Sequence, residues 1–226
     1  MDSEHRRLVE RLQDKNTSGD GSFRYVEGTL GGNHLILTQC GIGKVSAAVG
    51  ASELIRRFSP DCIVSTGVAG GIDACLKVTD VVASQRLVYH DVWCGDGNEY
   101  GQVQGFPASY EGCSSLLKHA LSLNEAGMES RIHSGLVCTG DRFITNRMEL
   151  DTIKQRFPGG LAVDMESAAI AQTCHLYNVP FLSFRIISDT PGVEDHASQY
   201  ADFWGTMAER SFLTIWTFLS TLPSNL

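Results

Sequence analysis

Short apolar segments alternate with amphipathic ones along most of the chain, and this alternation is its main structural signal. Apolar runs rich in Val and Ile and bounded by glycine or polar residues predict strands over residues 23–28, 34–40, 62–66, 78–88, 133–138, 161–164 and 180–188. Apolar residues spaced by three and four predict helices over residues 3–12, 45–58, 111–123, 146–157, 166–177 and 200–219. Residues 16–22 are predicted as a polar turn and residues 92–112 as a loop. Strands that alternate with helices predict an α/β fold with a largely parallel or mixed sheet.

The composition is that of an ordinary globular domain and argues against several classes of protein. Of 226 residues, 42% are hydrophobic and 19% are charged, and no repeat or linker divides them, so we expect a single domain over residues 1–226. The net charge of −8 and the lack of a basic stripe argue against binding to nucleic acid. With no apolar signal segment and no apolar run of about 18 residues, we expect no membrane span. The seven cysteines are scattered without a Cys-x-x-Cys pair, which indicates free thiols in the cytoplasm rather than disulfides or a zinc site.

Two acidic residues stand where predicted buried strands end. Glu166 follows the strand over 161–164, and Asp189 ends the strand that also contains Arg185. In open α/β sheets, ligands bind beyond the carboxyl ends of the strands. Each acid alone is equally well explained as a helix-starting charge or a turn cap, but the pair together with Arg185 favours a binding site.

Two glycine-rich segments, at residues 41–43 and 67–71, also follow predicted strands. Neither has the Gly-x-Gly-x-x-Gly dinucleotide pattern or the Walker pattern. Taken alone, such glycines are more often tight turns than ligand loops, but they allow the backbone to approach a flat ligand or a hydroxyl group closely. We therefore expect both segments beside the two acids.

Together these segments resemble the 5′-methylthioadenosine/S-adenosylhomocysteine nucleosidases, within the nucleoside phosphorylase superfamily. The matching motifs span nearly the whole chain and are Gly41-Ile42-Gly43-Lys44-Val45, Ser65-Thr66-Gly67-Val68-Ala69-Gly70-Gly71, Tyr89-His90-Asp91, Glu99-Tyr100-Gly101-Gln102, Thr139-Gly140-Asp141-x-Phe143-Ile144, Val163-Asp164-Met165-Glu166 and Ile187-Ser188-Asp189. The resemblance implies a three-layer α/β sandwich around a mixed, barrel-like sheet, and a homodimer. It also implies irreversible hydrolysis of the adenine–ribose bond. We expect no cofactor, and the seven histidines have no metal-ligand spacing, so no metal is expected either.

The resemblance assigns catalytic roles to three residues. Asp189 should protonate the leaving adenine at N7, Glu4 should activate the attacking water, and Arg185 should lie close to that water and to Glu166. Glu166 and Met165 should hold the ribose, with Glu166 accepting hydrogen bonds from its hydroxyl groups.

Other residues should contact the base and the 5′ substituent. Phe143 and Ile144 should flank the purine, and Tyr200, where the family often has Phe, should line the alkylthio end. The remaining expected binding residues are Val68, Ala69, Gly70 and Ser188.

Cleavage of this bond requires the two acids to have opposite charge states. Adenine anion is a poor leaving group, so an acid must protonate it, and such help is worth roughly 10² to 10⁴ in rate. We expect burial to raise the pKa of Asp189 from its reference value of about 4, so that it holds a proton. The start of a helix favours the ionised form of Glu166, which suits contact with a cationic ribose ring.

Three features depart from the family pattern. The family begins with a short apolar strand before the segment that matches residues 1–4, and none precedes Met1, so we expect a fold whose first strand is missing. Glu4 would then lack its anchor, and we expect residues 1–4 to be displaced and the activity of this chain to be reduced. Asp164 stands where many members have Glu, and Val68 stands where Ser is common.

Three other functions remain open at this point. A nucleoside phosphorylase would need cationic groups around phosphate, and Ser65 and Thr66 occupy the stretch where phosphorylases of this superfamily carry Arg, so hydrolysis is favoured. A futalosine-type hydrolase would have a similar site for a different 5′ group. A catalytically inactive nucleoside-binding relative is disfavoured by the presence of Asp189, Glu166 and Arg185.

Two weaker signals concern the motif at residues 89–91 and the loop after it. His90 is better explained as a structural or interfacial histidine than as a catalytic base. In the family, the comparable loop of the partner subunit helps to close the pocket, so the loop with Trp93 favours a lid built by a dimer.

Overall fold

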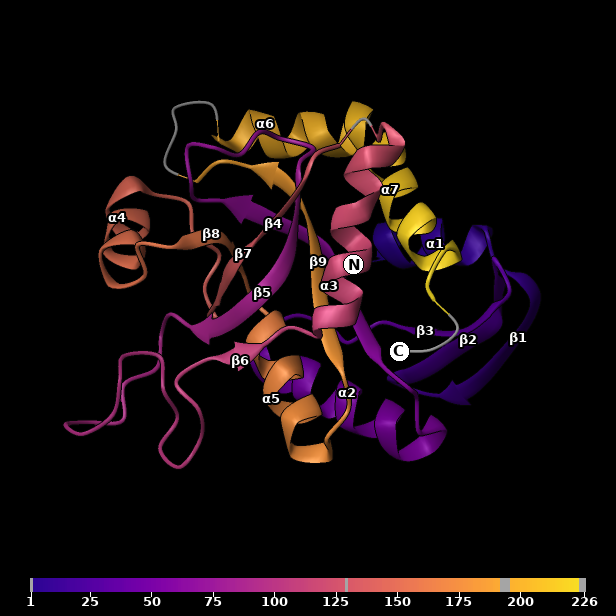
Figure 1. The fold of residues 1–226 in the computed structure, drawn as a ribbon, viewed down its shortest axis with the longest axis horizontal. Coiled ribbons are helices and arrows are strands. Elements are labelled where there is room, and N and C mark those ends of the chain that lie inside the picture. Colours follow the sequence, from indigo (N-terminus) through magenta and orange to yellow (C-terminus); the bar gives the residue numbers. More distant parts are fainter. Residues whose placement is uncertain (1, 129, 192–195, 224–226) are drawn as a thin grey trace.

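The computed structural model describes residues 2–128, 130–191 and 196–223, which form two sheets with helices packed around them (Figure 1). The larger sheet has the strand order β6-β5-β7-β8-β4-β9, and a further pairing of β5 with β9 closes it into a barrel. Its strands are β4 (Ile63–Gly71), β5 (Val81–Tyr89), β6 (Tyr110–Glu111), β7 (Ile132–Thr139), β8 (Gly160–Asp164) and β9 (Phe181–Asp189). The smaller sheet is antiparallel and consists of β1 (Gln13–Asp20), β2 (Phe23–Leu30) and β3 (Asn33–Thr38).

The barrel is mixed because its strands run in two directions. β5, β7 and β8 are parallel to one another, and β4 and β9 are parallel to each other. The β4–β8 and β5–β9 pairs are antiparallel, so the end of β8 overlaps the end of β4, where Gly70 pairs with Val163. The expected α/β fold with a mixed, barrel-like sheet is confirmed.

Helices pack on two sides of the barrel, each over its own apolar cluster. α2 (Lys44–Phe58) and α5 (Ser167–Tyr177) share one cluster, whereas α1 (Asp2–Glu10), α3 (Ser114–Ser122) and α7 (Ala208–Ser220) share the other. β9 contributes to both clusters and is buried at every position, as its continuous apolar run predicts. The remaining helical segments are η1 (Leu123–Ala126), α4 (Arg147–Arg156), α6 (His196–Asp202) and η2 (Phe203–Met207). Within the described residues, no helix is long and apolar enough to cross a bilayer.

The prediction of a polar turn over residues 16–22 is wrong, because β1 runs through most of that segment. β1 is almost entirely exposed, and its sequence is polar throughout. A strand with both faces in water has no alternation of apolar and polar residues, so its pattern is that of a loop. β1 is stabilised instead by its antiparallel pairing with β2.

Two other element boundaries also differ from the predictions. β4 does not end before the glycine-rich segment but continues through it to Gly71. The predicted helix over 200–219 is interrupted by the π-helical segment η2 between α6 and α7. Such π segments are rare, single-turn insertions in α-helices, so the sequence pattern predicts one continuous helix instead.

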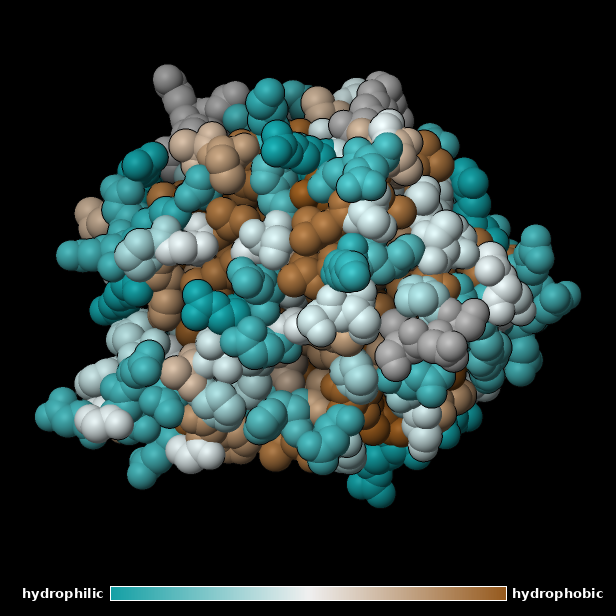
Figure 2. Space-filling view, in the orientation of Figure 1, coloured by the Kyte–Doolittle hydropathy of each residue, from teal (hydrophilic) through white to brown (hydrophobic). Residues whose placement is uncertain are grey.

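Polar residues cover most of the surface in Figure 2, where apolar residues emerge as separate patches. One group of exposed apolar residues lies on the helices that flank the larger sheet on one side. It consists of Val45 and Val49 on α2 and Leu176 and Tyr177 on α5. Ile42, just before α2, is also exposed. This surface is called the α2–α5 face below.

Candidate active site

A cavity of about 1100 Å³ opens where β4, β8 and β9 meet. This volume slightly exceeds the roughly 300–1,000 Å³ of typical small-molecule pockets. Every residue that the sequence places at the site lines this cavity, namely Glu4, Val68, Ala69, Gly70, Phe143, Ile144, Met165, Glu166, Arg185, Ser188, Asp189 and Tyr200. The fold therefore brings together residues from the whole length of the chain.

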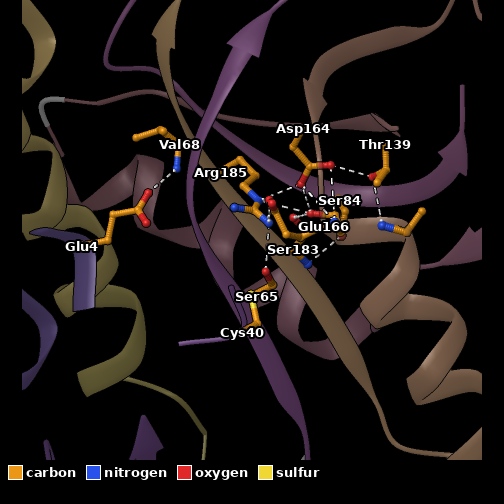
Figure 3. Close-up of polar contacts among 12 residues, drawn as sticks. Glu4, Cys40, Ser65, Val68, Ser84, Thr139, Asp164, Glu166, Ser183 and Arg185 are labelled. Atoms are coloured by element: carbon orange, nitrogen blue, oxygen red, sulfur yellow. Dashed lines mark hydrogen bonds and ion pairs between the residues drawn. The ribbon is translucent and has the colours of Figure 1, made fainter. Parts of the chain in front are cut away.

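Arg185 lies at the centre of the polar network in Figure 3. Its guanidinium Nε is 3.0 Å from Asp164 Oδ2, and Nη2 is 3.6 Å from Glu166 Oε2. Nη2 also donates to the hydroxyl of Ser65, at 3.1 Å. Arg185 is 4% exposed, and its cost of burial is offset by these carboxylates and hydroxyls. Because a Cβ at Gly67 would lie 2.5 Å from Nη1, the glycine allows the strand to pass the guanidinium.

Asp164 is a residue whose role the sequence did not reveal. Its Oδ1 accepts a hydrogen bond from Thr139 Oγ1 at 2.6 Å, and its Oδ2 accepts from the Ser167 hydroxyl. The side chain is only 1% exposed and contacts Arg185. The only signal was its departure from the family's usual Glu, which carried no information about its partners.

Glu166 is the N-cap residue of α5, and a second helix also begins next to it. Its Oε1 accepts a hydrogen bond from the backbone N–H of Gly43, the N-cap residue of α2, at 3.0 Å. Burial raises the pKa of Glu166, while Arg185 and the Gly43 N–H act in the opposite direction. Glu166 does lie at the start of a helix, as predicted. Its pKa is nevertheless raised, because the effect of burial is larger than that of the interactions that favour the ionised form.

Glu4 occupies the site rather than a displaced position, so that expectation is wrong. It lies on α1, and its Oε1 accepts a hydrogen bond from the backbone N–H of Val68 at 3.2 Å (Figure 3). The same oxygen would lie 3.2 Å from a Cβ at Gly67. The first turn of α1 and the β4 backbone hold this carboxylate beside the Arg185 network. Residue 1 lies outside the described residues.

Asp189 ends β9 and is 2% exposed. The hydroxyl of Ser188 donates to its Oδ1 at 2.5 Å and also lies 3.4 Å from the carbonyl oxygen of Ala69. The cavity therefore has one buried carboxyl group at this strand end and a separate group of carboxylates around Arg185.

Aromatic side chains form another part of the cavity wall. The rings of Phe143 and Tyr200 meet edge to face with centroids 5.9 Å apart. Phe143 is 58% exposed, whereas Ile144 beside it is buried. A flat apolar ligand would find ring faces and edges here.

The motifs at residues 41–45, 89–91 and 139–141 meet in an ion-pair network beside the cavity. Lys44 Nζ lies 2.9 Å from both carboxylate oxygens of Asp91, and the Lys44 backbone N–H donates to Asp141 Oδ1 at 2.7 Å. The Asp141 N–H in turn donates to Asp91 Oδ2. This network fixes the turn that presents the Gly43 N–H to Glu166. The sequence matched these motifs to the family but did not reveal this contact.

His90 is buried and does not line the cavity. Its Nε2 has no hydrogen-bond partner, and burial lowers the pKa of the imidazole. A Cβ at Gly140 would overlap the ring, so the glycine makes room for it. These observations favour the structural interpretation of His90. Among the described residues, no group of three or more His, Cys, Asp or Glu side chains is arranged to hold a metal ion.

Comparison with known proteins agrees with this geometry. The family model of the phosphorylase superfamily matches residues 1–220. The chain is 42% identical over 199 residues to a 5′-methylthioadenosine/S-adenosylhomocysteine nucleosidase of Chromohalobacter salexigens, covering 88% of this chain and 85% of the relative. It is 36% identical to the protein of the same name from Tolumonas auensis, covering 98% and 96% of the two chains.

Solved structures show the same likeness in three dimensions. The nucleosidase of Neisseria meningitidis in complex with methylthio-immucillin-A has a TM-score of 0.92 and 35% identity, with 98% of this chain and 96% of that chain covered. The adenine complex of the Colwellia psychrerythraea nucleosidase has a TM-score of 0.90 and 35% identity, with 97% and 91% covered. Sequence and fold agree over almost the whole length of the chain, which thus belongs to the 5′-methylthioadenosine/S-adenosylhomocysteine nucleosidase family of the phosphorylase superfamily.

Proposed function

We propose that this chain hydrolyses the N-glycosidic bond of 5′-methylthioadenosine and S-adenosylhomocysteine, releasing adenine and the 5′-thio-ribose. The observation that carries the proposal is the division of acidic groups in one cavity. Asp189 lies buried at one strand end, whereas Glu4 and Glu166 surround Arg185. The names of the relatives and the adenine and methylthio-immucillin-A complexes support it.

Asp189 is the proposed acid for the leaving base. A carboxyl group that is 2% exposed has little solvation for its charged form, which favours the protonated form. Proton transfer to N7 lets adenine depart as a neutral molecule. The Ser188 hydroxyl fixes the orientation of this carboxyl group.

Glu166 and Met165 are the proposed ribose contacts. The positive charge that builds up on the ribose ring is stabilised by a carboxylate beside it. Glu166 Oε1 and Oε2 each have one partner, Gly43 N–H and Arg185, and a carboxylate oxygen accepts more than one hydrogen bond. The ribose hydroxyls can therefore donate to the same group.

Phe143, Ile144 and Tyr200 are the proposed walls for the purine and the 5′ substituent, and the β4 residues Val68, Ala69 and Gly70 line the remaining edge.

Glu4 is the proposed base for the attacking water. It lines the cavity, and its carboxylate lies close to Gly67 and to the guanidinium of Arg185. A base must lie within hydrogen-bond reach of the proton that it removes, and the position of Glu4 near Arg185 and Glu166, the proposed ribose contact, supports this role.

Charge pairing favours hydrolysis over phosphorolysis. Two arginines line the described part of the cavity, and both are already paired with carboxylates. Arg185 pairs with Asp164 and Glu166, and Arg142 pairs with Glu149. A phosphate dianion needs cations that are available to it, and Ser65 already accepts from Arg185.

Adenine release from methylthioadenosine, measured with and without phosphate, tests the proposed function. We expect release that does not depend on phosphate, and we expect Asp189→Asn to lower kcat by about 10² to 10⁴. Asp151→Asn, on the exposed side of α4, is the matched control and should retain the wild-type rate. Release only in the presence of phosphate would identify a phosphorylase. Binding of adenine without turnover would identify a binding protein, and turnover of futalosine alone would identify a different hydrolase.

We further propose a homodimer that covers the α2–α5 face. Val45 is 76% exposed and Ile42 is 65% exposed, which is unusual for neighbouring apolar residues on a water-facing surface. Ile42 also lines the cavity, so a partner on this face would reach its mouth. The cytoplasm is the proposed location, supported by seven cysteines that are all free thiols.

A further inference from the structure

The Arg185 side chain is held at the Nε edge of its guanidinium. Its Nε donates to the Ser167 hydroxyl at 3.1 Å and lies 3.0 Å from Asp164 Oδ2. The side chain of Asp164 is only 1% exposed, and Ser167 is fully buried. We propose that Asp164, together with Ser167, is a positioning residue that binds the Nε edge of Arg185 and thereby keeps Glu166 available to the ribose.

Hydrogen bonds fix Asp164 in one orientation. Oδ1 accepts from Thr139, whose hydroxyl in turn accepts from the backbone N–H of Ala168 at 2.9 Å. Oδ2 accepts from the hydroxyl of Ser167 and from its backbone N–H at 3.2 Å. The Ser167 hydroxyl also contacts that of Ser183 at 2.6 Å. A carboxylate held by three donors on two elements cannot follow Arg185, so Arg185 must adapt to it.

This arrangement decides which carboxylate neutralises the buried guanidinium. Asp164 is the nearer partner at 3.0 Å, and Glu166 is the more distant one at 3.6 Å. If Glu166 were the only partner, a buried Arg185 would be expected to form a two-point contact with it. The Glu166 oxygens would then point to the guanidinium and away from the ribose.

The alternative is that Asp164 only stabilises the fold as a buried ion pair. The two interpretations predict different changes in Glu166 when the charge of Asp164 is removed. The charged and titratable groups around Glu166 are Arg185 on β9, Asp164 on β8, Glu4 on α1 and Cys40 after β3. Removal of the Asp164 charge takes away a negative neighbour and releases Arg185 toward Glu166, and both changes favour the ionised form of Glu166.

Asp164→Asn tests the proposal, which rests on the proposed function for its kinetic readout. We expect kcat/KM for methylthioadenosine to fall by about 10- to 100-fold, because a small displacement of positioned groups has effects of this size. We also expect the acid limb of its pH profile to move to lower pH. Carbon-13 NMR of the Glu166 carboxyl should show the same shift in the absence of substrate, whether or not the chain is an active nucleosidase.

Two further variants separate positioning from stability. Asp73→Asn removes a different paired aspartate, at the Lys154 ion pair outside the cavity, and should lower the melting temperature without moving the pH profile or the Glu166 titration. Ser167→Ala keeps all charges and should lower kcat/KM by about tenfold or less. If Asp164→Asn does not fold, Ser167→Ala is the test variant in its place. An unchanged kcat/KM of Ser167→Ala would then overturn the proposal. For folded Asp164→Asn, a Glu166 titration and an acid limb at their wild-type positions would overturn it, whatever the loss of melting temperature. Absence of adenine release from the wild-type chain would overturn the proposed function alone.

Discussion

Three carboxylates surround one guanidinium in the cavity, so the site carries more negative than positive charge. Asp164, Glu166 and Glu4 all interact electrostatically with Arg185. In a buried cavity this imbalance is costly for the empty protein and favourable for a ligand that becomes cationic. A ribose that develops positive charge during bond cleavage is such a ligand, whereas an anionic co-substrate is disfavoured.

Single residues differ in how far the sequence could reveal them. Glu166, Asp189 and Arg185 could be placed at the site because they lie in motifs at strand ends. The partners of Asp164 on β7 and β9 could not be predicted, because Thr139 and Arg185 are distant from it in sequence and adjacent only in the folded chain. Glu4 was expected at the site but was wrongly expected to lose its anchor, because the sequence does not show that α1 and the Val68 N–H hold it.

A residue outside the cavity provides a prediction about acid stability. The Lys154 ammonium, 2.8 Å from Asp73, and the Cys75 N–H lower the pKa of Asp73 to about 2. A carboxylate whose pKa is lowered on folding stabilises the protein above its unfolded pKa of about 4, and the contribution is lost as the pH falls toward 2. Because the pair is partly exposed, we expect Asp73→Asn to cost about 1 kcal/mol at pH 7.

Urea unfolding of the wild type and of Asp73→Asn at pH 7, 4 and 3 measures this contribution. The difference in unfolding free energy between the wild type and Asp73→Asn should be largest at pH 7. It should be smaller at pH 4 and smaller again at pH 3. Asp151→Asn, which removes an exposed i,i+4 pair with Arg147, should change stability by less than about 0.5 kcal/mol at each pH. A difference for Asp73→Asn that is the same at pH 7 and pH 3 would exclude the ion pair as its cause.

At the scale of elements, patterns with strong physical signals were predicted well. The Asn146–Glu149 pattern marks the start of α4, where the Asn146 side chain accepts from the Glu149 N–H at 3.0 Å. The apolar run over 180–188 became the fully buried β9. β1 and η2 were missed because an exposed strand and a π segment leave no distinct apolar pattern.

The α2–α5 face provides a prediction at this scale. If a second copy of the chain covers it, Val45→Asp should place charge in the interface and shift the protein to a monomer. Adenine release should also fall, because the partner would no longer cover the mouth of the cavity near Ile42. Sedimentation equilibrium measures the mass, and Leu213→Asp, on the exposed side of α7, is the matched control. A wild-type chain that sediments as a monomer at micromolar concentration would exclude the dimer.

For the molecule as a whole, the cavity is large because it continues from the residues around Arg185 into the space between the two sheets. β9 pairs with one edge of β4 along its length, whereas within the described residues the other edge pairs with β8 only at Gly70 and Gly71. β3 ends the small sheet and faces the same space, which is lined by Leu35, Leu37 and Leu54. Two open strand edges therefore lie on either side of an apolar space.

This geometry predicts the effect of supplying a strand there. α1 begins at Asp2, and Glu4 contacts Val68 near the end of β4, so an extension joined ahead of Met1 would run back along β4 and parallel to it. A strand in this space would be buried on both faces and should be apolar throughout. About seven apolar residues would gain about 1.5–3 kcal/mol each on burial, against about 1–2 kcal/mol each for ordering the chain. A net gain of about 3 kcal/mol would raise Tm by about 6–12 °C in a domain of this size.

We therefore expect the chain with an added apolar heptapeptide to melt at a higher temperature and to release adenine faster, because β4 and α1 would hold Glu4 more rigidly. Calorimetry and the adenine-release rate measure the two effects on one preparation. An extension of equal length made of Ser and Asp is the control, since it cannot enter an apolar space and should change neither quantity. If the apolar extension raises Tm but not the rate, the strand stabilises the barrel and Glu4 is already positioned without it. If neither quantity changes, the space between β3 and β4 does not accept a strand, and the expectation of reduced activity in this chain loses its basis.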